Sequence, residues 1–469
     1  MKEILDHKVF EQIGEAADEL GVDTYVVGGY VRDKLMQRQT KSKDIDFVAV
    51  GSGIALAKKV AQILGRSKIA IFKNFGTAQV KHQDLELEFV GARKESYNRD
   101  SRKPIVEDGS LEDDQKRRDF TINAMAVCLN KVRYGELIDP FDGVADLEKG
   151  IIRTPLDPHI TYSDDPLRMM RAIRFASQLN FIIEEKSLQA IHETKDRITI
   201  ISKERVSDEL NKIMLSSKPS LGLHLFYKTG LMHYFLPEII ALKGVEEIEG
   251  QLHKDNFYHT LQVVDNIAET TDNLWLRYAA LFHDIGKPVT KKFVKGTGWT
   301  FHNHEFVGAK MVYKVFKRLK LPLGDKLKYV QKIVRMSSRP IAVTEEQATD
   351  SAARRLLFDA GDDLNELMLL CEADITTQNK KKKARFLENF KTVRARLKEV
   401  EEADQVRDFQ PPVDGAEIME LFNIPPGREI GIIKEYIKEA ILEGTIKNNH
   451  EEALALAIAI GKELGLNTT

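Results

Sequence analysis

The pattern of apolar and polar positions changes about a third of the way along the chain. Up to residue 150, short apolar runs rich in β-branched and aromatic residues recur, beginning with "TYVV" at 24–27 and "DIDFVAV" at 44–50. Three more follow, "KIAIF" at 68–72, "AQVKH" at 78–82 and "LELEFVGA" at 85–92. Runs of this length and composition predict strands. Together with helical spacing in residues 1–20 and 31–37, they predict a small α/β region.

From about residue 165 the apolar spacing becomes helical and strand signals nearly disappear. Examples are "PLRMMRAIRFASQL" at 166–179 and "SKERVSDELNKIML" at 202–215. A second helical module opens near residue 250, and a stretch punctuated by proline and glycine near residue 410 begins a last small helical unit. We therefore expect an α+β protein with four parts: a head at 1–150, a helical neck at 151–245, a helical domain at 246–395 and a helical tail at 396–469.

Composition and charge narrow the choice of partners and compartment. The 469 residues are 42% hydrophobic and carry a net charge of -2, so any site for a polyanion must be a local basic patch. The densest basic cluster is Lys380–Arg385. Two cysteines without metal-type spacing indicate a reducing compartment, and we expect a cytoplasmic protein. No apolar run approaches the roughly 18 residues that a membrane span needs, so no membrane partner is expected.

Two aspartates, Asp44 and Asp46, stand one residue apart in a predicted strand, shortly after the glycine pair Gly28 and Gly29. Residues i and i+2 of a strand point to the same face, so the two carboxylates project together. Paired carboxylates suit Mg²⁺, which accepts phosphate oxygens as its remaining ligands. The glycine pair before a short helix allows backbone N–H groups to approach phosphates. The strand "LELEF" offers a further carboxylate, and the pattern predicts a metal-dependent nucleotide site.

Five segments in order resemble the motifs of the class II tRNA nucleotidyltransferase and bacterial poly(A) polymerase family. They are "GGYVRD…DIDF", "RRDFTINAMA" at 117–126, "DPFDGVADLEKGIIRT" at 139–154, "DDPLRMMRAIRF" at 164–175 and "ERVSDELNKIM" at 204–214. The resemblance covers nearly the whole chain. It implies a polymerase-β-like head with a mixed sheet of about five strands, followed by all-helical neck, body and tail regions.

The resemblance implies a role for each motif residue. Asp44, Asp46 and Glu88 would be the catalytic carboxylates, with Asp44 and Asp46 holding Mg²⁺. Nucleotide contacts would come from Gly28, Gly29, Arg32, Asp33, Arg118, Asp119, Asn123, Asp165, Arg168, Arg171 and Arg174. In the family, the aspartate and arginine of an E-D-x-x-R pattern pair with the incoming base. Here Asp165 and Arg168 match that pair, while Asp164 stands where glutamate is usual. Two residues at i and i+3 of one helix can reach one base edge.

A second ordered set supplies His259, the adjacent pair His283 and Asp284, His304 and Asp374. Imidazole and carboxylate ligands of this kind suit a hydrolytic metal centre. The set resembles the HD phosphohydrolase superfamily, which many bacterial members of the nucleotidyltransferase family carry at this place. The resemblance implies a divalent transition metal and a possible phosphatase or cyclic phosphodiesterase activity on damaged RNA 3′ ends.

The reading that the resemblance favours is addition of CCA, from CTP, CTP and then ATP, to the acceptor end of tRNA. The polar segment between residues 92 and 120 is expected to be a mobile loop of full length, which in the family accompanies addition of both C and A. The alternatives are a poly(A) polymerase, a CC-adding or A-adding enzyme, a protein that is chiefly an HD-type phosphohydrolase, and a noncatalytic RNA-binding protein.

Overall fold

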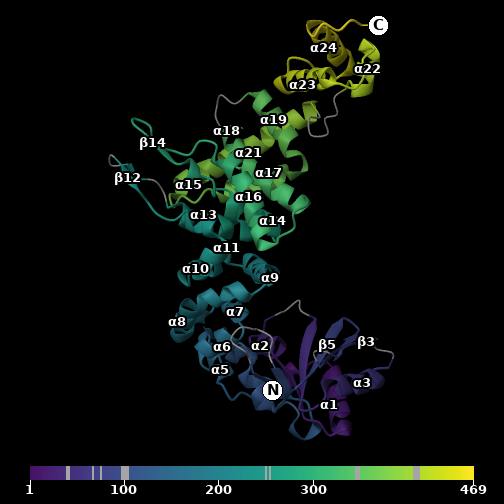
Figure 1. Cartoon of the computed structure of the whole chain (residues 1–469), viewed down its shortest axis with the longest axis vertical. Coiled ribbons are helices and arrows are strands. Elements are labelled where there is room, and N and C mark those ends of the chain that lie inside the picture. The colour runs from purple at the N-terminus through teal and green to yellow at the C-terminus, as the bar shows by residue number, and fades with distance from the viewer. Residues whose placement is uncertain are drawn as a thin grey trace. The chain divides into compact units, whose positions relative to one another are not determined.

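The computed structural model describes residues 1–38, 43–65, 68–73, 76–96, 105–248, 251–252, 255–343, 349–404 and 412–468. It divides into two compact units, Met1–Pro237 and Glu238–Thr469 (Figure 1). The boundary does not test the four parts expected from the sequence, which stay a prediction.

A mixed sheet forms the base of the first unit. Its strands, seven among the described residues, run in the order β3-β4-β5-β2-β1-β8-β9. Only β2 and β5 are parallel neighbours; the other pairs are antiparallel. The bounds are β1 Thr24–Val27, β2 Asp44–Ala49, β3 Lys68–Phe72, β4 Thr77–His82, β5 Leu85–Gly91, β8 Ala126–Cys128 and β9 Leu137–Ile138. The sheet is therefore larger than the expected five strands, because β8 and the short β9 extend it beyond β1.

Alternation along the central strands decides which side chains reach the core. Ile45 and Phe47 of β2 pack with Leu87 and Phe89 of β5 beneath helices α1 (Val9–Leu20) and α3 (Gly53–Ile63). Residues at the alternate positions point to the opposite face of the sheet. Asp44, Asp46 and Glu88 occupy these positions, so the sheet that buries one apolar face presents the carboxylates on the other.

Short helices and a hairpin complete the head. Helix α2 (Gly29–Leu35) follows β1, and α5 (Gly143–Lys149) follows β9. The segment expected to be a mobile loop contains regular elements among its described residues: β6 (Arg93–Ser96) pairs with β7 (Ile105–Asp108), and α4 (Leu111–Lys116) follows. Ser110 and Asp113 cap that helix reciprocally, which explains why it begins there. Residues 97–104 lie outside the described residues.

The rest of the first unit is mainly helical, as the apolar spacing predicts. It contains α6 (Pro158–Asp164), α7 (Leu167–Leu179), α8 (Glu185–Thr194), α9 (Lys203–Met214), α10 (Pro219–Lys228) and α11 (Met232–Phe235), with α12 (Pro237–Ile240) at the boundary. Helix α7 packs against both α9 and α10. Its residues Arg171 and Arg174 therefore lie between the head and the helices that follow.

The second unit is also mainly helical. Its helices are α13 (Asn256–Ala268), α14 (Leu274–Phe282), α15 (Lys287–Thr290), α16 (His304–Leu319), α17 (Asp325–Met336), α18 (Arg339–Val343), α19 (Asp350–Ala360), α20 (Leu364–Ala373), α21 (Lys380–Asp404), α22 (Gly415–Phe422), α23 (Arg428–Glu443) and α24 (His450–Glu463). The last three share a small core of their own. A search of the described helices finds none with the length and apolarity needed to cross a bilayer.

Candidate functional site

Parallel pairing of β2 with β5 brings the head carboxylates together. The register places Asp46 opposite Glu88 and Asp44 opposite Glu86. Ile45, Phe47, Leu87 and Phe89 are buried on the other face, which fixes the direction of the acidic side chains. A shift of one residue in this register would bury the carboxylates, so the apolar pattern that builds the core also builds the site.

Burial and mutual repulsion raise the pKa of two of these carboxyl groups. For Asp46, desolvation raises the pKa and Asp44 adds to the rise, while Arg118 opposes it. For Glu88, desolvation raises the pKa, as do Asp46 and Asp44. Closely spaced carboxylates that disfavour one another's charge are the environment that a divalent cation stabilises. The donor set therefore fits Mg²⁺, although the oxygens of Asp44, Asp46 and Glu88 do not form a group within 4.8 Å of one another among the described residues.

Gly28 lies directly beside these carboxylates. Its φ angle of +74° is one that other residues rarely adopt, and a Cβ atom there would lie 3.3 Å from Oδ2 of Asp46. The same Cβ would lie 3.5 Å from a guanidinium nitrogen of Arg118. Asp114 holds Arg118 through a hydrogen bond of 3.0 Å from Nε. The structure thus brings together Gly28, Asp46 and Arg118, from three of the predicted motif positions.

A buried polar network joins the head to helix α7. Nη1 of Arg32 donates to Oδ1 of Asn123 at 2.8 Å, and Nδ2 of Asn123 donates to Asp119 at 3.0 Å. Nε of Arg171 donates to the other oxygen of Asp119 at 2.7 Å. Arg32 also donates to Asp33 at 2.8 Å. Burial raises the pKa of Asp119, but pairing with Arg171 outweighs this effect and lowers the pKa to about 2. Five predicted nucleotide-site residues therefore lie in one connected network.

Phe175, a residue that the motif pattern did not single out, lies among three predicted arginines. The guanidinium carbons of Arg174, Arg32 and Arg171 lie 4.0, 5.0 and 5.5 Å from its ring centroid. Cation–π contacts of this kind orient guanidinium groups without neutralising them. The sequence carried one signal for this contact: Phe175 stands one residue after Arg174 and four residues after Arg171 on the same helix. Such spacing is also common in an ordinary core.

Asp165 and Arg168 do not share a helix, contrary to the expectation. Asp165 lies between α6 and α7, and its carboxylate accepts a hydrogen bond of 3.2 Å from the backbone N–H of Leu167. Arg168 lies in the first turn of α7, and its guanidinium donates at 2.5 Å to the carbonyl of Arg117 and at 3.5 Å to that of Thr161. The proline at 166 disfavours a helical conformation for the residue before it, so the helix begins after Asp165.

The β6–β7 hairpin contacts this region through Arg117. Nη1 of Arg117 donates to Glu95 of β6 at 3.2 Å, and Nε donates to Asp114 at 2.9 Å. The carbonyl of Arg117 also accepts a hydrogen bond from Arg168. Arg117 therefore contacts both the hairpin and the arginine that is predicted to recognise the base. A movement of the hairpin would therefore shift Arg117 and the carbonyl that Arg168 contacts.

The second predicted constellation converges inside the second unit. His259, His283 and Asp284 form a buried group whose ligand atoms lie within 4.8 Å of one another. Nε2 of His259 lies 2.7 Å from Oδ1 of Asp374, and Nε2 of His304 lies 3.7 Å from Oδ1 of Asp284. The structure thus gathers all five predicted residues, although His304 contributes at a longer distance. Lys287 Nζ donates to Asp284 at 2.7 Å.

Hydrogen bonds orient the histidine rings for metal binding. Nδ1 of His283 lies 2.8 Å from the carbonyl of Ala280, and Nδ1 of His304 lies 2.9 Å from that of Phe301. A carbonyl only accepts, so both Nδ1 atoms carry the proton and each Nε2 faces the carboxylates. Nδ1 of His259 lies 2.9 Å from the hydroxyl of Thr376. This arrangement is typical of metal-binding histidines, in which the second ring nitrogen donates to an outer acceptor.

Nε2 of His283 is buried without a hydrogen-bond partner in the described part of the chain, and it lies 3.5 Å from Oδ1 of Asp374. Although burial opposes it, contact with Asp284 and Asp374 raises the pKa of His283 to about 10. Metal binding to such a group displaces a proton. The imidazole and carboxylate donors fit a divalent transition metal.

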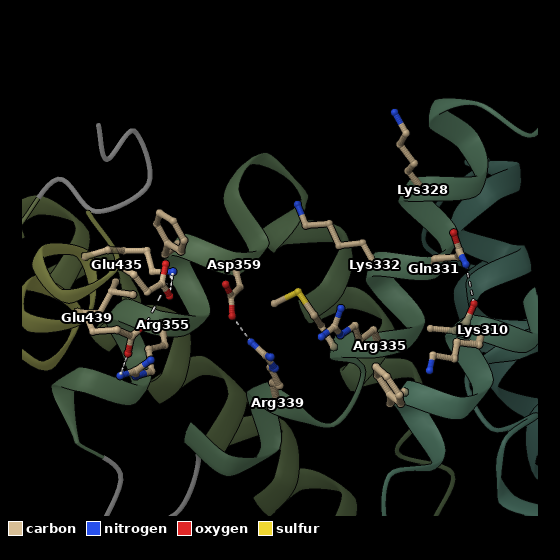
Figure 2. A pocket seen from close by; sticks show the side chains of 16 residues that line it. Lys310, Lys328, Gln331, Lys332, Arg335, Arg339, Arg355, Asp359, Glu435 and Glu439 are labelled. Atoms are coloured by element: carbon tan, nitrogen blue, oxygen red, sulfur yellow. Dashed lines mark hydrogen bonds and ion pairs between the residues drawn. The ribbon is translucent and has the colours of Figure 1, made fainter. Parts of the chain in front are cut away.

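A large basic pocket is a further candidate site that the sequence did not indicate. Its volume is about 880 Å³, and it is lined by seven cationic and three acidic residues from α16, α17, α18, α19 and α23 (Figure 2). Several cations are paired with acids, such as Arg355 with Glu439 at 2.6 Å. Arg335 and Lys310 instead contact the exposed ring of Phe306, at 5.4 and 4.0 Å. The pocket is thus a local basic patch on a nearly neutral chain.

Comparison with known proteins identifies three matching families along the chain. The Poly A polymerase head domain matches residues 24–153, the family described as "Probable RNA and SrmB- binding site of polymerase A" matches 180–242, and the HD domain matches 256–379. The chain is 30% identical to the multifunctional CCA protein of Shewanella frigidimarina, over 75% of this chain and 83% of that protein. It is 29% identical to the A-adding tRNA nucleotidyltransferase of Deinococcus radiodurans, over 91% and 93%.

Solved structures with the same fold include the Bacillus stearothermophilus CCA-adding enzyme in complex with CTP. It is 22% identical, covers 98% of this chain and 99% of that chain, and has a TM-score of 0.69. A tRNA nucleotidyltransferase complexed with a primer tRNA and an incoming ATP analog is 25% identical, covers 82% and 99%, and has a TM-score of 0.55. These likenesses agree with an α+β head followed by a largely helical remainder.

Proposed function

Because the chain belongs to the class II tRNA nucleotidyltransferase family, with a polymerase head, an RNA-binding region and an HD domain, we propose that it adds the full CCA sequence to tRNA. The reaction uses CTP twice and then ATP, and releases one pyrophosphate at each step. The observation that carries the proposal is the cluster of Asp44, Asp46 and Glu88 beside Gly28 and Arg118.

Each residue of the cluster has a physical task in this reaction. Asp44 and Asp46 would hold Mg²⁺, which polarises the phosphate oxygens and lowers the pKa of the attacking hydroxyl when it is bound. The raised pKa of Glu88 suits its carboxylate to accept the proton of the tRNA 3′-hydroxyl. The hydroxyl oxygen then forms a bond with the α-phosphorus, and the bond to the pyrophosphate breaks. Gly28 leaves room for the triphosphate, and Arg118 donates to its oxygens.

In this proposal, Asp165 and Arg168 recognise the base. Arg168 donates and the Asp165 carboxylate accepts, which matches the acceptor and donor groups on the edge of cytosine. A small movement of the pair is required for adenine. The contact of Glu95 with Arg117, whose carbonyl holds Arg168, supports a role for the β6–β7 hairpin in that movement. This coupling favours addition of both nucleotides over addition of one.

The experiment that tests this proposal is 3′-end sequencing of tRNA transcripts that lack CCA, end in C or end in CC. Each transcript is incubated with Mg²⁺, CTP and ATP. We expect all three to end in CCA and to stop there. A product that gains only A after CC, only CC, or a long A tract would replace CCA addition with the corresponding alternative.

The basic pocket of Figure 2 supports a second part of the proposal, which concerns tRNA binding. Lys328, Lys332 and Arg335 lie on one face of α17, at spacings of four and three residues. Arg335 forms no ion pair with a carboxylate among the described residues, so its charge is available to a ligand. We infer that this face contacts phosphates of the tRNA backbone, which gives affinity without sequence preference.

A second activity, phosphohydrolysis in the HD domain, is favoured by the orientation of its histidines. His259, His283, Asp284 and Asp374 would hold the metal, with His304 nearby. A divalent ion at such a centre supplies an activated water for attack on phosphorus. Lys287 would stabilise the phosphate oxygens. Hydrolysis of a 3′-phosphorylated RNA end would release phosphate and leave a 3′-hydroxyl, the group that the head requires as its nucleophile.

Release of phosphate from a 3′-phosphorylated RNA tests the second activity. The protein is first stripped with a chelator and then supplied in turn with Mg²⁺, Mn²⁺, Co²⁺ and Ni²⁺. We expect activity with at least one transition metal, and its loss in the variant His283→Ala. If no metal restores hydrolysis while nucleotide addition proceeds normally, the HD centre has no such activity.

A further inference from the structure

A cavity of about 480 Å³ opens directly beside the HD centre. Asp374 forms part of its wall, and so does Thr376, whose hydroxyl lies 2.9 Å from Nδ1 of His259. The cavity is therefore continuous with the candidate metal ligands. Its volume lies in the range of about 300–1,000 Å³ that is usual for small-molecule sites.

Part of the cavity wall is apolar and aromatic. Ile341, Ile375, Phe386 and Phe390 form this part, and Ile341 is 44% exposed. Lys382 and Phe386 stand four residues apart on α21, with Nζ of Lys382 at 5.6 Å from the ring centroid. An aromatic face beside a cation is suited to a stacked base with a phosphate next to it. A cavity whose wall contains a candidate metal ligand, aromatic side chains and a cation fits a nucleoside phosphate.

The basic cluster Lys380–Arg385 lies at the start of the same helix. The carbonyl oxygen of the Asn379 side chain accepts from the backbone N–H of Lys382 at 3.1 Å and caps this end. None of the five cations in the cluster has an ion pair with a carboxylate in the described part of the chain. Later on α21 the basic residues do pair: Lys391 with Glu388 at 2.9 Å, Arg394 with Glu372 at 2.9 Å and Arg396 with Asp350 at 3.0 Å. The unpaired charge is therefore concentrated at the end of α21 that supplies Lys382 to the cavity wall.

We propose that this cavity holds the 3′-terminal nucleoside of a single-stranded RNA end, and that cations of the Lys380–Arg385 cluster bind the phosphates that precede it. The inference rests on the proposed phosphohydrolase function of the HD centre. It adds where the proposed RNA terminus binds, and it favours an RNA terminus over a free nucleotide because the charge extends beyond the volume that one nucleoside fills. Phe386 would stack with the terminal base, and Asp374 would be among the residues that hold a metal ion near its phosphate.

Photocrosslinking to the metal-free full-length protein tests where the RNA end lies. A five-nucleotide RNA with a terminal 4-thiouridine 3′-phosphate is mixed with the protein in chelator, irradiated and mapped by mass spectrometry. We expect a crosslinked peptide that contains Phe386. Crosslinks confined to residues 1–237 would overturn the proposal, because the RNA end would then occupy only the head.

Binding of the same RNA, measured by fluorescence anisotropy in chelator, tests the named residues. Phe386→Ala is expected to weaken binding about tenfold, since a stacking platform is removed. The double variant Lys382→Ala with Arg385→Ala, which removes the two cluster cations beside Phe386, is expected to reduce the salt slope of log K by about 1.4, because two phosphate contacts are lost at about 0.7 each. Lys398→Ala, an exposed lysine on the same helix, is the matched control and should change neither quantity.

Two further arms separate this inference from the activity on which it rests. A 3′-phosphorylated mononucleotide should bind at least tenfold more weakly than the five-nucleotide RNA; equal affinity would show that the cluster contributes nothing and would overturn the RNA assignment. If the RNA crosslinks to Phe386 but no metal supports hydrolysis, the binding site stands and the phosphohydrolase fails. If hydrolysis occurs and Phe386→Ala leaves both binding and hydrolysis unchanged, the inference fails alone.

Discussion

Asp119 is the residue through which the head and helix α7 are joined. Its carboxylate accepts from Asn123 and Arg171, and its pKa of about 2 lies below the usual 3.8. A carboxyl whose pKa is lowered on folding stabilises the folded state fully above its unfolded pKa. That contribution is lost as the pH falls from about 4 to about 2. A shift of about two pKa units corresponds to about 2–3 kcal/mol.

We therefore expect Asp119→Asn to lower the free energy of unfolding of the first unit by about 2–3 kcal/mol at pH 7, and by much less at pH 2. Urea unfolding followed by far-UV circular dichroism at both pH values measures this. Asp84→Asn is the control, because the Asp84 side chain is 89% exposed and its pair with Lys43 is 3.4 Å long. Equal effects of the two substitutions would contradict the role assigned to Asp119.

For single residues, the placement of the motif residues was predictable from the sequence, whereas the side chains that contact them were not. Strand alternation placed Asp44 and Asp46 on one face, because that face is set by the apolar residues between them. The packing of three arginines around Phe175 and the pairing of Arg174 with Glu209 of α9 join segments that are distant in sequence. Nothing in the local pattern of either segment specifies the other, so these contacts required the fold.

Among the elements, α17 offers the clearest test of tRNA binding. Arg335→Glu is expected to weaken tRNA binding and to reduce the salt slope of log K by about 1, since one phosphate contact is lost. Lys326 is the matched control on the same helix. It stands nine residues earlier, which at 3.6 residues per turn places it on the opposite face. Anisotropy titrations with tRNA at several salt concentrations compare Arg335→Glu with Lys326→Glu; equal loss in both variants would remove the α17 face from the interface.

Most elements followed from the apolar pattern, and the exception is informative. The β6–β7 hairpin and α4 lie in a polar segment that lacks the periodicity by which strands and helices are recognised. The capping pair Ser110 and Asp113 was readable in the sequence as a helix start, and it was the available signal for α4. The strands of the hairpin pair through their backbones, and Glu95 of β6 forms ion pairs with Arg93 of the same strand and with Arg117 after α4, which periodicity does not register.

For the whole molecule, the two candidate metal centres lie in different compact units. Asp44→Ala is expected to abolish nucleotide addition and to leave phosphate release unchanged, whereas Asp284→Asn should do the reverse. Both activities are measured on the same preparations. Both tryptophans, Trp275 and Trp299, belong to the second unit, so their fluorescence reports whether Asp284→Asn still folds there. Loss of both activities in either variant, with fluorescence unchanged, would show that the centres depend on one another.

If Arg168 recognises the base as proposed, the manner in which it is held has a consequence for how product choice changes between relatives. Its guanidinium is anchored by two main-chain carbonyls, those of Arg117 and Thr161, rather than by side chains. A substitution at either position leaves its carbonyl in place, so the anchor is insensitive to ordinary point mutation. Divergence of specificity would then proceed through insertions, deletions and altered backbone paths in the β6–β7 hairpin and before α7. Alignments of motif residues alone would miss that divergence.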